Sequence, residues 1–244
     1  MANGIYVALS GANAQARAVD VVSYNIANAG TTGFRGQKAV FGEALAQAGA
    51  QGGATRQDSA YATLAQVATD ASQGELVNTE NPFDLALVGD GFFVIDTARG
   101  PRYTRAGNFR LDTEGVLVDN QGNMPRTTDG GHLQVPANTK SVQVEGDGTV
   151  VADGEIVGTL ELACFTPESM IREGAIFYNT APNAVRVGAL PEVLSGALES
   201  SNVNPVRGMV DLIRMSRSYE SLVTAIESYR QIDGRVARDI GGPK

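Results

Sequence analysis

Apolar residues near the N-terminus recur at alternating steps of three and four positions, with Gln15 as the single polar interruption. The members of this series are Ile5, Ala8, Ala12, Val19, Val22, Ile26 and Ala29. Such spacing places one apolar stripe along a helix. Most of these side chains are small, so a partner helix could approach closely. We expect the helix to end near Gly30–Gly33, where Gly-Thr-Thr-Gly favours a turn.

A second, longer helix is predicted at the C-terminus. Its apolar positions keep the same spacing, broken only by Asp233: Leu212, Met215, Tyr219, Leu222, Ile226, Tyr229, Val236 and Ile240. Asn204 is a suitable N-cap, and Pro205 suits the first helical position because no N–H is needed there. Gly241 and Pro243 form a matching stop signal. The pattern therefore predicts a helix over residues 205–240, about 54 Å long.

A helix of this length with one narrow apolar stripe needs another helix against which to bury that stripe. The partner could be the other terminal helix, as in an intramolecular hairpin, or a helix of a neighbouring copy in an assembly. The spacing alone does not name the partner, so both interpretations stay open at this point.

Between the two helices, short apolar runs alternate with turn residues. Residues 84–96 hold two such runs around Gly89-Asp90-Gly91, which predicts a β-hairpin. Closely spaced turn signals follow, and the strands expected between them are 116–118, 141–144, 149–152 and 159–165. This arrangement favours an antiparallel meander or small barrel over a βαβ fold. Residues 42–75, rich in Ala, Gln and Gly, are interpreted as a connector.

Charge separates the ends of the chain from its middle. The 244 residues carry a net charge of −8. Residues 1–40 have three basic and one acidic residue, and residues 200–244 have seven basic and five acidic residues. The segment 41–199 has nine basic and 21 acidic residues, a net of −12. The ends are therefore interpreted as one structural unit and the middle as another, and the overall acidity argues against a nucleic-acid partner.

The composition offers little for catalysis. One cysteine, Cys164, excludes a disulfide framework, and one histidine, His132, excludes a multi-histidine metal site. Cys164 is interpreted as a core residue and His132 as a solvated turn residue. The Gly89-Asp90-Gly91 segment lacks the third glycine of a dinucleotide loop, because Val94 stands there. We predict no catalytic residue, metal site or cofactor, no transmembrane segment and no cleaved signal peptide.

Three stretches carry a family resemblance. The first is residues 25–35, Asn-Ile-Ala-Asn-Ala-Gly-Thr-Thr-Gly-Phe-Arg, and the third is residues 198–204, Leu-Glu-Ser-Ser-Asn-Val-Asn. The second spans residues 81–122, and its characteristic positions are Asp84, Gly89, Gly91, Phe92, Phe93, Tyr103, Arg105, Gly107 and Phe109. In this order, and over nearly the whole chain, they resemble the axial proteins of the bacterial flagellum, which are the rod and hook proteins.

The resemblance implies an α+β fold in which N- and C-terminal helices pair, coiled-coil-like, around an inserted antiparallel β-rich domain. The expected division is a discontinuous helical inner domain, 1–35 with 198–244, a partly extended connector, 36–80, and a β-rich outer domain, 81–197. The length suits a rod protein. The opening residues 4–12 resemble the proximal-rod branch of the family, with the distal-rod branch as the alternative. Pro205 departs from the family pattern but fits a helix start.

The resemblance further implies a structural, non-enzymatic subunit of the periplasmic rod, polymerising helically through heterologous contacts to transmit torque. The implied partners are copies of itself, other rod subunits and the flagellar type III export apparatus. Asn28, Gly33 and Phe34 are expected to shape the turn after the first helix, and Arg217 and Glu220 to form polar contacts across helices. The remaining residues expected in the helical assembly layer are Val19, Val22, Ile26, Leu212, Tyr219, Leu222, Ile226 and Tyr229.

Two other classes of protein remain as alternatives at this stage. One is a β-rich surface-binding module with a helical stalk, and the other is a hydrolase that uses a pair of carboxylates. A rod subunit predicts protease-sensitive termini around a resistant core near residues 80–195, whereas a stalked module predicts ordered, resistant ends.

Overall fold

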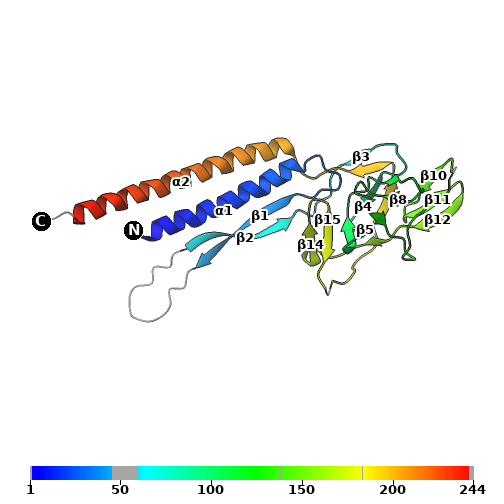
Figure 1. Cartoon of the computed structure of the whole chain (residues 1–244), viewed down its shortest axis with the longest axis horizontal. Helices are drawn as coiled ribbons and strands as arrows, with labels where there is room; N and C mark the ends of the chain where they lie inside the picture. Colours follow the sequence, from blue (N-terminus) through cyan, green and yellow to red (C-terminus); the bar gives the residue numbers. More distant parts are fainter. Residues whose placement is uncertain (1, 46–59, 138, 183, 242–244) are drawn as a thin grey trace. The chain divides into compact units, whose positions relative to one another are not determined.

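The computed structural model describes residues 2–45, 60–137, 139–182 and 184–241. The fold is α+β, as predicted: an N-terminal helix α1 (Ala2–Ala27), a β-rich middle and a C-terminal helix α2 (Pro205–Gly241) (Figure 1). The chain groups into two compact units. Unit 1 is Met1–Ala27, Gln37–Asp70 and Asn204–Lys244, and unit 2 is Asn28–Gly36 and Ala71–Val203. Residues 28–35 and 198–203, which the sequence-based division gave to the helical domain, lie in unit 2.

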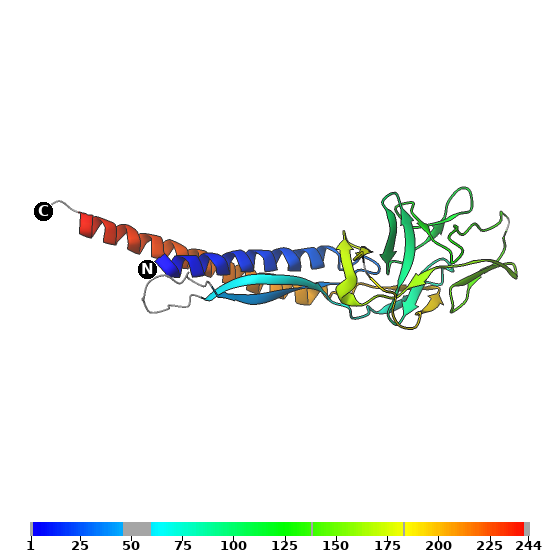
Figure 2. The same ribbon diagram turned by 90° about the horizontal axis from the view of Figure 1, so that it is seen from below.

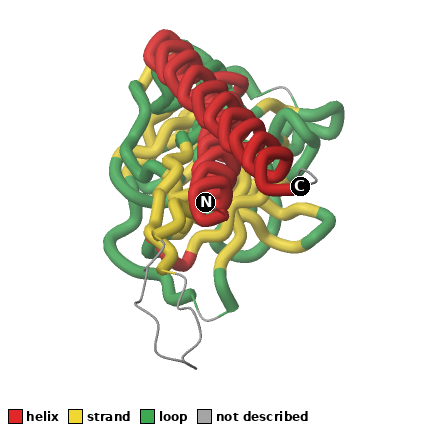
Figure 3. Tube along the Cα trace, turned by 90° about the vertical axis from the view of Figure 1, so that its left-hand side faces the viewer, coloured by secondary structure: helices red, strands yellow, loops and turns green. Residues whose placement is uncertain are grey.

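Unit 1 contains α1, α2 and a β-hairpin. The views in Figures 1 and 2 agree that α1 and α2 lie side by side, and Figure 3 shows that the two helices cross at an inclination. The hairpin joins β1 (Gln37–Leu45) to β2 (Ala60–Thr69) in an antiparallel ladder with a register shift between Val40 and Phe41. The segment expected to be a partly extended connector therefore includes two paired strands.

Helix α1 ends at Ala27, three residues before the predicted Gly-Thr-Thr-Gly turn. One of its faces contacts the hairpin, where the Asn25 side chain donates to the Gln37 carbonyl and accepts from the Gln37 N–H, both at 2.8 Å. Ala14, Ala18 and Val21 are buried, and their spacing places them on the same face as Asn25.

Helix α2 begins where the sequence predicted. Pro205 is its first residue, and the Asn204 side chain accepts a hydrogen bond from the Arg207 N–H at 3.0 Å. The Asn204 carbonyl also accepts from the Gly208 N–H at 3.0 Å. This is the N-cap arrangement expected from Asn followed by Pro, and it is confirmed.

Every strand pair among the described residues is antiparallel. The largest sheet of unit 2 has the order β13-β5-β6-β15-β14, with β9 also paired to β5, and a three-stranded meander has the order β10-β11-β12. Three two-stranded ladders complete the unit: β16-β4, β17-β3 and β7-β8. The strands are β3 (Leu76–Asn78), β4 (Leu85–Val88), β5 (Phe92–Thr97), β6 (Gly100–Thr104), β7 (Arg110–Leu111), β8 (Leu117–Val118), β9 (Met124–Pro125), β10 (Val142–Val144), β11 (Thr149–Ala152), β12 (Glu155–Thr159), β13 (Leu162–Ala163), β14 (Met170–Glu173), β15 (Phe177–Thr180), β16 (Glu192–Ser195) and β17 (Ala197–Glu199), and a 3₁₀ helix covers Pro167–Ser169.

Strand β5 separates two apolar clusters because successive side chains point to opposite faces. Phe93 and Ile95 lie in the main core, which also includes Leu87, Leu133 and Leu160. Phe92 and Val94 point to the other face, into a smaller cluster that contains Tyr103, Phe165 and Tyr178.

The hairpin predicted around Gly89-Asp90-Gly91 is wrong. Both strands form, but β4 pairs with β16 and β5 pairs with β6, β9 and β13. Instead of pairing with β5, the carbonyls of Leu87 and Gly89 accept hydrogen bonds from the buried Arg105 guanidinium. Pairing with strands further along the chain therefore overrides the local turn signal.

The strand predicted at 149–152 is confirmed with these bounds, and those at 116–118 and 141–144 are each found one residue shorter. The single strand expected at 159–165 is divided between two sheets. Residue Thr159 ends β12, which pairs with β11, whereas Leu162 begins β13, which pairs with β5. The chain leaves the sheet of β11 and joins the sheet of β5 at Leu160 and Glu161, and an apolar run in the sequence does not predict this change.

Candidate functional site: helix surfaces and a buried ion cluster

The face of α2 that contacts α1 carries a contact residue at every seventh position. These residues are Gly208, Met215, Leu222 and Tyr229, here called the heptad stripe. A repeat of seven keeps such residues on one narrow side of a helix.

The partners on α1 follow in the reverse order along the chain. Ile26 contacts Gly208, Gln15 contacts Met215, and Gly11 and Gly4 contact the next two members of the heptad stripe. The helices therefore run antiparallel. Gln15 is the polar break in the apolar series, and its side-chain amide donates to the Met215 carbonyl at 3.3 Å.

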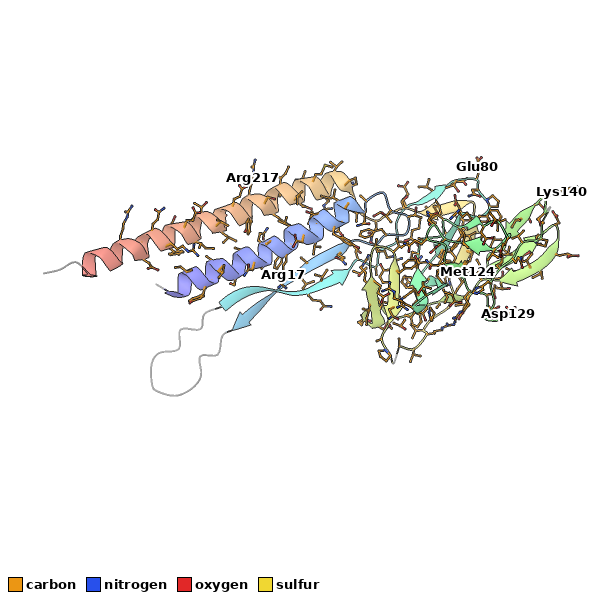
Figure 4. The ribbon with its side chains drawn as sticks, viewed as in Figure 1. Arg17, Glu80, Met124, Asp129, Lys140 and Arg217 are labelled. Atoms are coloured by element: carbon orange, nitrogen blue, oxygen red, sulfur yellow. The ribbon has the colours of Figure 1, made fainter. Side chains whose placement is uncertain are left out.

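The residues predicted for the helical assembly layer divide into two groups. The half-buried ones are Val19, Val22, Ile26, Leu212, Leu222 and Ile226, and the exposed ones are Arg217, Tyr219, Glu220 and Tyr229. In the described part of the chain, neither Arg217 nor Glu220 forms a salt bridge, and Figure 4 shows Arg217 pointing away from α1. Val236 and Ile240 lie outside the described side chains.

A second row of residues on α2 is exposed. It consists of Val206, Val210, Ile213, Arg217 and Glu220, here called the second stripe, and its steps are again three and four. Val206, Ile213 and Glu220 each come two positions before a member of the heptad stripe, which corresponds to about 200° around a helix of 3.6 residues per turn. The second stripe therefore lies on the side of α2 away from its contacts with α1.

Unit 1 exposes further large apolar side chains. They lie on α1 (Tyr6, Val7 and Leu9), on the hairpin (Val40, Phe41 and Val67) and elsewhere on α2 (Met209 and Ile232).

Unit 2 contains a buried ion cluster. The Arg105 and Glu199 side chains are 0% and 1% exposed, and Arg105 Nη1 lies 3.1 Å from Glu199 Oε2. The same guanidinium donates to the carbonyls of Leu87 and Gly89 and lies over the Phe92 ring. Its fixed fork of donors suits this set of acceptors better than a lysine ammonium would.

A second arginine completes the ion cluster. Arg35 Nη2 lies 3.6 Å from Glu199 Oε1, and its side chain is also buried. Burial and the nearby positive charge of Arg35 lower the pKa of Arg105, while Glu199 acts in the opposite direction. Two cations therefore share one carboxylate, so losing that carboxylate would leave like charges together in a low-dielectric interior.

Phe34, in the turn after α1, is buried in unit 2. The Arg172 guanidinium lies over the rings of Phe34 and Tyr178, 5.0 Å from each ring centre, and donates to the Arg35 carbonyl and the Tyr178 hydroxyl. Burial raises the pKa of Tyr178, against the effect of the arginines. Gly33 donates its N–H to the Glu199 carbonyl at 2.8 Å, so this turn is part of the same network. Asn28 begins the turn, and its carbonyl accepts from the Thr31 N–H.

The predicted motif positions of the β-rich segment are packing residues. Phe93 meets Phe109 edge-on with ring centres 5.4 Å apart, and Tyr103 meets Phe165 in the same way at 4.8 Å. The Asp84 carbonyl accepts hydrogen bonds from two backbone N–H groups next to β17. The three motif glycines lie at turns or close approaches of the backbone: Gly89, Gly91 and Gly107.

The prediction of site residues missed Glu199, Arg35, Asn202 and Arg172. The first three stand inside stretches that carry the family resemblance, but charged and polar residues ordinarily signal a solvated surface. Arg172 lies outside those stretches, and no local pattern marks it.

Catalysis or metal binding would require a cluster of suitable side chains among the described residues. No group of three or more His, Cys, Asp or Glu side chains is placed to hold a metal ion, and His132 is exposed. Cys164 is buried with a free thiol, as expected. A cavity of about 460 Å³ in unit 2 is lined by Phe83 and Leu111 together with Asp112 and Lys140, among others. Within the described ranges, neither helix has the length and apolarity needed to cross a membrane.

Three family models match this chain. Residues 5–35 match the "Flagella basal body rod protein" family, residues 86–152 the "Flagellar hook protein FlgE/F/G D1 domain" and residues 194–239 the "Flagellar basal body rod FlgEFG protein C-terminal" family. These segments contain the heptad stripe, the second stripe and all three residues of the ion cluster.

Curated relatives agree with the family models. The "Flagellar basal-body rod protein FlgF" of Caulobacter vibrioides is 33% identical over 99% of both chains. The protein of the same name in Salmonella typhimurium is 32% identical over 96% of this chain and 97% of its own. The "Flagellar basal-body rod protein FlgG" of Bacillus subtilis is 29% identical over 91% of this chain and 92% of its own. With relatives above 30% identity over nearly their whole length, this chain belongs to the family of flagellar basal-body rod proteins.

Proposed function

We propose that this structural rod subunit belongs to the proximal part of the rod and packs helically with neighbouring subunits through unit 1 to transmit torque. The observation that carries the proposal is the second stripe on α2, whose apolar members are exposed although they repeat with helical spacing. Val210 and Ile213 are 43% and 54% exposed. A regular apolar row that stays exposed among the described residues is suited to a helix of another subunit.

Charge supports the same arrangement. Residues 1–40 and 200–244, which include the two helices and their flanking segments, each carry a net +2, whereas residues 41–199 carry −12. We propose that the terminal helices pair in a coiled-coil-like inner domain and that the acidic β-rich insert faces outward. Repulsion between acidic inserts would be weakest if the inserts point away from the shaft into solvent.

The residues proposed to carry assembly are those predicted on the helices. Val19, Val22 and Ile26 would join Leu212, Leu222 and Ile226 in the inner layer. Tyr219 and Tyr229 are exposed enough to reach a second subunit, and Arg217 and Glu220 extend the second stripe as polar contacts. Heterologous contacts of this kind generate an open helix instead of a closed ring.

The proposal includes export through the flagellar type III apparatus without a cleaved signal peptide and a final position in the periplasmic rod. Relatives named FlgF, matched over nearly their full length, support the proximal assignment. Relatives named FlgG match as well, so a distal-rod paralogue is the alternative, which isolation of rods stalled at successive stages would distinguish.

The experiment replaces the chromosomal gene of the native host with the double variant Val210→Asp/Ile213→Asp. The matched control is Ser218→Asp, which adds one carboxylate at another exposed position of α2. We expect the double variant to accumulate normally but to leave cells without hooks and unable to swim, while the control swims. Swimming cells with complete hooks in the double variant, or in a strain that lacks the gene, would overturn the proposal.

A further inference from the structure

The chain passes between the two units four times, after Ala27, Gly36, Asp70 and Val203. The first two passages are the two ends of the segment 28–36, and the other two lie a few residues from Ser72 and Asn202. Four passages between compact units would ordinarily be four independent flexible points. In this protein the segments beside them are connected within unit 2 by two residues.

Glu199 binds two of the segments concerned. Its carbonyl accepts from the Gly33 N–H at 2.8 Å, and its carboxylate oxygen Oε1 accepts from the Gly74 N–H at 3.2 Å. The other carboxylate oxygen is held by Arg105, which itself is bound to the carbonyls at the end of β4. Glu199 therefore attaches both segments to the interior of unit 2.

Asn202 binds the same two segments three residues further along. Its Oδ1 accepts from the Gly36 N–H at 2.7 Å, and its backbone N–H donates to the Phe34 carbonyl at 3.4 Å. Its Nδ2 donates to both the carbonyl and the hydroxyl of Ser72 at 3.0 Å. The side-chain amide of Asn202 thus connects Gly36 and Ser72 to its own segment next to the last passage, and its backbone N–H adds a bond to Phe34.

We propose that Glu199 and Asn202, here called the clasp, act together to make the four passages one cooperative element instead of four separate ones. The physical reason is that both residues bind the same two segments. Pairing of β17 with β3, the Ser200 N–H on the Glu75 carbonyl and the bond from Arg172 to the Arg35 carbonyl also hold these segments. Loss of Glu199 or Asn202 removes part of the shared attachment, so the segments can move at the other residue as well. The stretch 198–204, which carries part of the family resemblance, acquires a specific physical role by this proposal.

The test is hydrogen exchange on the full-length chain, measured at the backbone amides of Gly33, Gly36 and Gly74. The variants are Glu199→Gln, which keeps the shape of the side chain, and Asn202→Ala. Ser195→Ala is the matched control, because it removes one side-chain hydrogen bond, to the Pro82 carbonyl, at a site away from the passages. Loss of a buried hydrogen-bond partner is expected to accelerate exchange about tenfold or more.

If the clasp acts as one element, substitution of either residue should also accelerate hydrogen exchange at the amides that the other residue binds. Asn202→Ala should accelerate exchange at Gly33 and Gly74, whose acceptors are on Glu199. Glu199→Gln should accelerate exchange at Gly36, whose acceptor is on Asn202. A role confined to each residue would change only that residue's own partners and would overturn the proposal.

The core of unit 2 supplies the internal reference. The Val94 and Leu160 N–H groups donate to backbone carbonyls in the strand region and should keep their protection in both variants. Equal acceleration at Val94 would mean that the variant unfolds the whole unit, which also overturns a clasp that acts on the passages.

The consequence for the rod rests on the proposed function. In a rod subunit, passages that move together would carry load between the two units in parallel. Swimming of cells with Asn202→Ala tests this consequence by itself. If hydrogen exchange is coupled between the two residues but the cells swim normally, the clasp is supported and its mechanical role in the rod is overturned.

Discussion

A Cβ atom on Gly107 would lie 1.8 Å from the carbonyl oxygen of Leu85, while the Gly107 carbonyl accepts a hydrogen bond from the Leu85 N–H at 2.9 Å. The two backbones are therefore in direct contact, and no side chain fits between them. This contact connects the segment after β6 to the start of β4, both of which contain positions of the family motif.

Gly107→Ala is expected to destabilise unit 2 by about 3 kcal/mol or more, because the backbones must separate and the hydrogen bond to Leu85 weakens. Urea unfolding of the full chain, followed by tyrosine fluorescence, measures the change. Gly30→Ala is the control, since a Cβ at Gly30 meets no atom within 4 Å. Equal midpoints for the two variants would contradict the packing assignment.

Arg105→Lys is expected to cost about 3–5 kcal/mol of unfolding free energy, although it keeps the charge. Lysine cannot direct a planar fork of donors at Glu199 and at the carbonyls of Leu87 and Gly89, so a buried carboxylate is left poorly paired. Arg99→Lys serves as the control, because that side chain is 76% exposed and lies 3.8 Å from Glu173. The prediction fails if the two substitutions have the same effect on the urea midpoint.

Gly208→Ala and Gly234→Ala should change the stability of the helices in opposite directions. A Cβ on Gly208 would lie 2.9 Å from Ile26 Cγ1, so overpacking outweighs the better helix propensity of alanine and costs about 1 kcal/mol net. At Gly234 a Cβ meets nothing within 4 Å, so the same change should stabilise α2 by about 1 kcal/mol. Thermal melting followed by circular dichroism at 222 nm reports both, and two shifts of the same sign would refute the heptad stripe.

The Asp153 carboxylate should contribute to stability at neutral pH and lose that contribution in acid. Hydrogen bonds from the backbone N–H groups of Lys140 and Ser141 lower the pKa of Asp153. For an acid whose folded pKa lies below the unfolded value of about 3.9, the stabilisation is fully present above that value. It is lost as the pH falls through the folded pKa.

Urea midpoints of the wild type and of Asp153→Asn, measured at pH 7 and again near pH 2, test this sign. The wild type should be the more stable at pH 7, and the difference should shrink in acid. A difference that stays constant or grows between the two pH values would contradict the assigned direction.

How much could be predicted from the sequence differs between the two units. The bounds of α2 follow from three-four spacing, from Asn204 and Pro205 at its start and from Gly241 at its end, all of which act within a few residues. In unit 2 the positions of several strands were predictable but their partners were not. β4 is followed by a strong turn signal and nevertheless pairs with β16, about 100 residues further along the chain.

The candidate site shows the same division. A helical stripe can be read from spacing, so Ile26, Met215, Leu222 and Tyr229 were predicted as stripe residues, but the contacts made by Gly4, Gly11 and Gly208 were not. Spacing also could not say which stripe finds its partner inside the chain. The ion cluster could not be predicted, because burial of Arg105 and Glu199 depends on residues 94 positions apart meeting in the interior.

By itself, the sequence determined where α2 begins and ends, which segments are β-rich, how charge is distributed and to which family the chain is similar. These properties depend on residues close together in the chain, whose spacing, capping and turn chemistry act locally. Only the tertiary structure decided which strands pair, which face of α2 stays exposed and which charged residues are buried. Those outcomes depend on contacts between distant residues, whose free energy no local pattern contains.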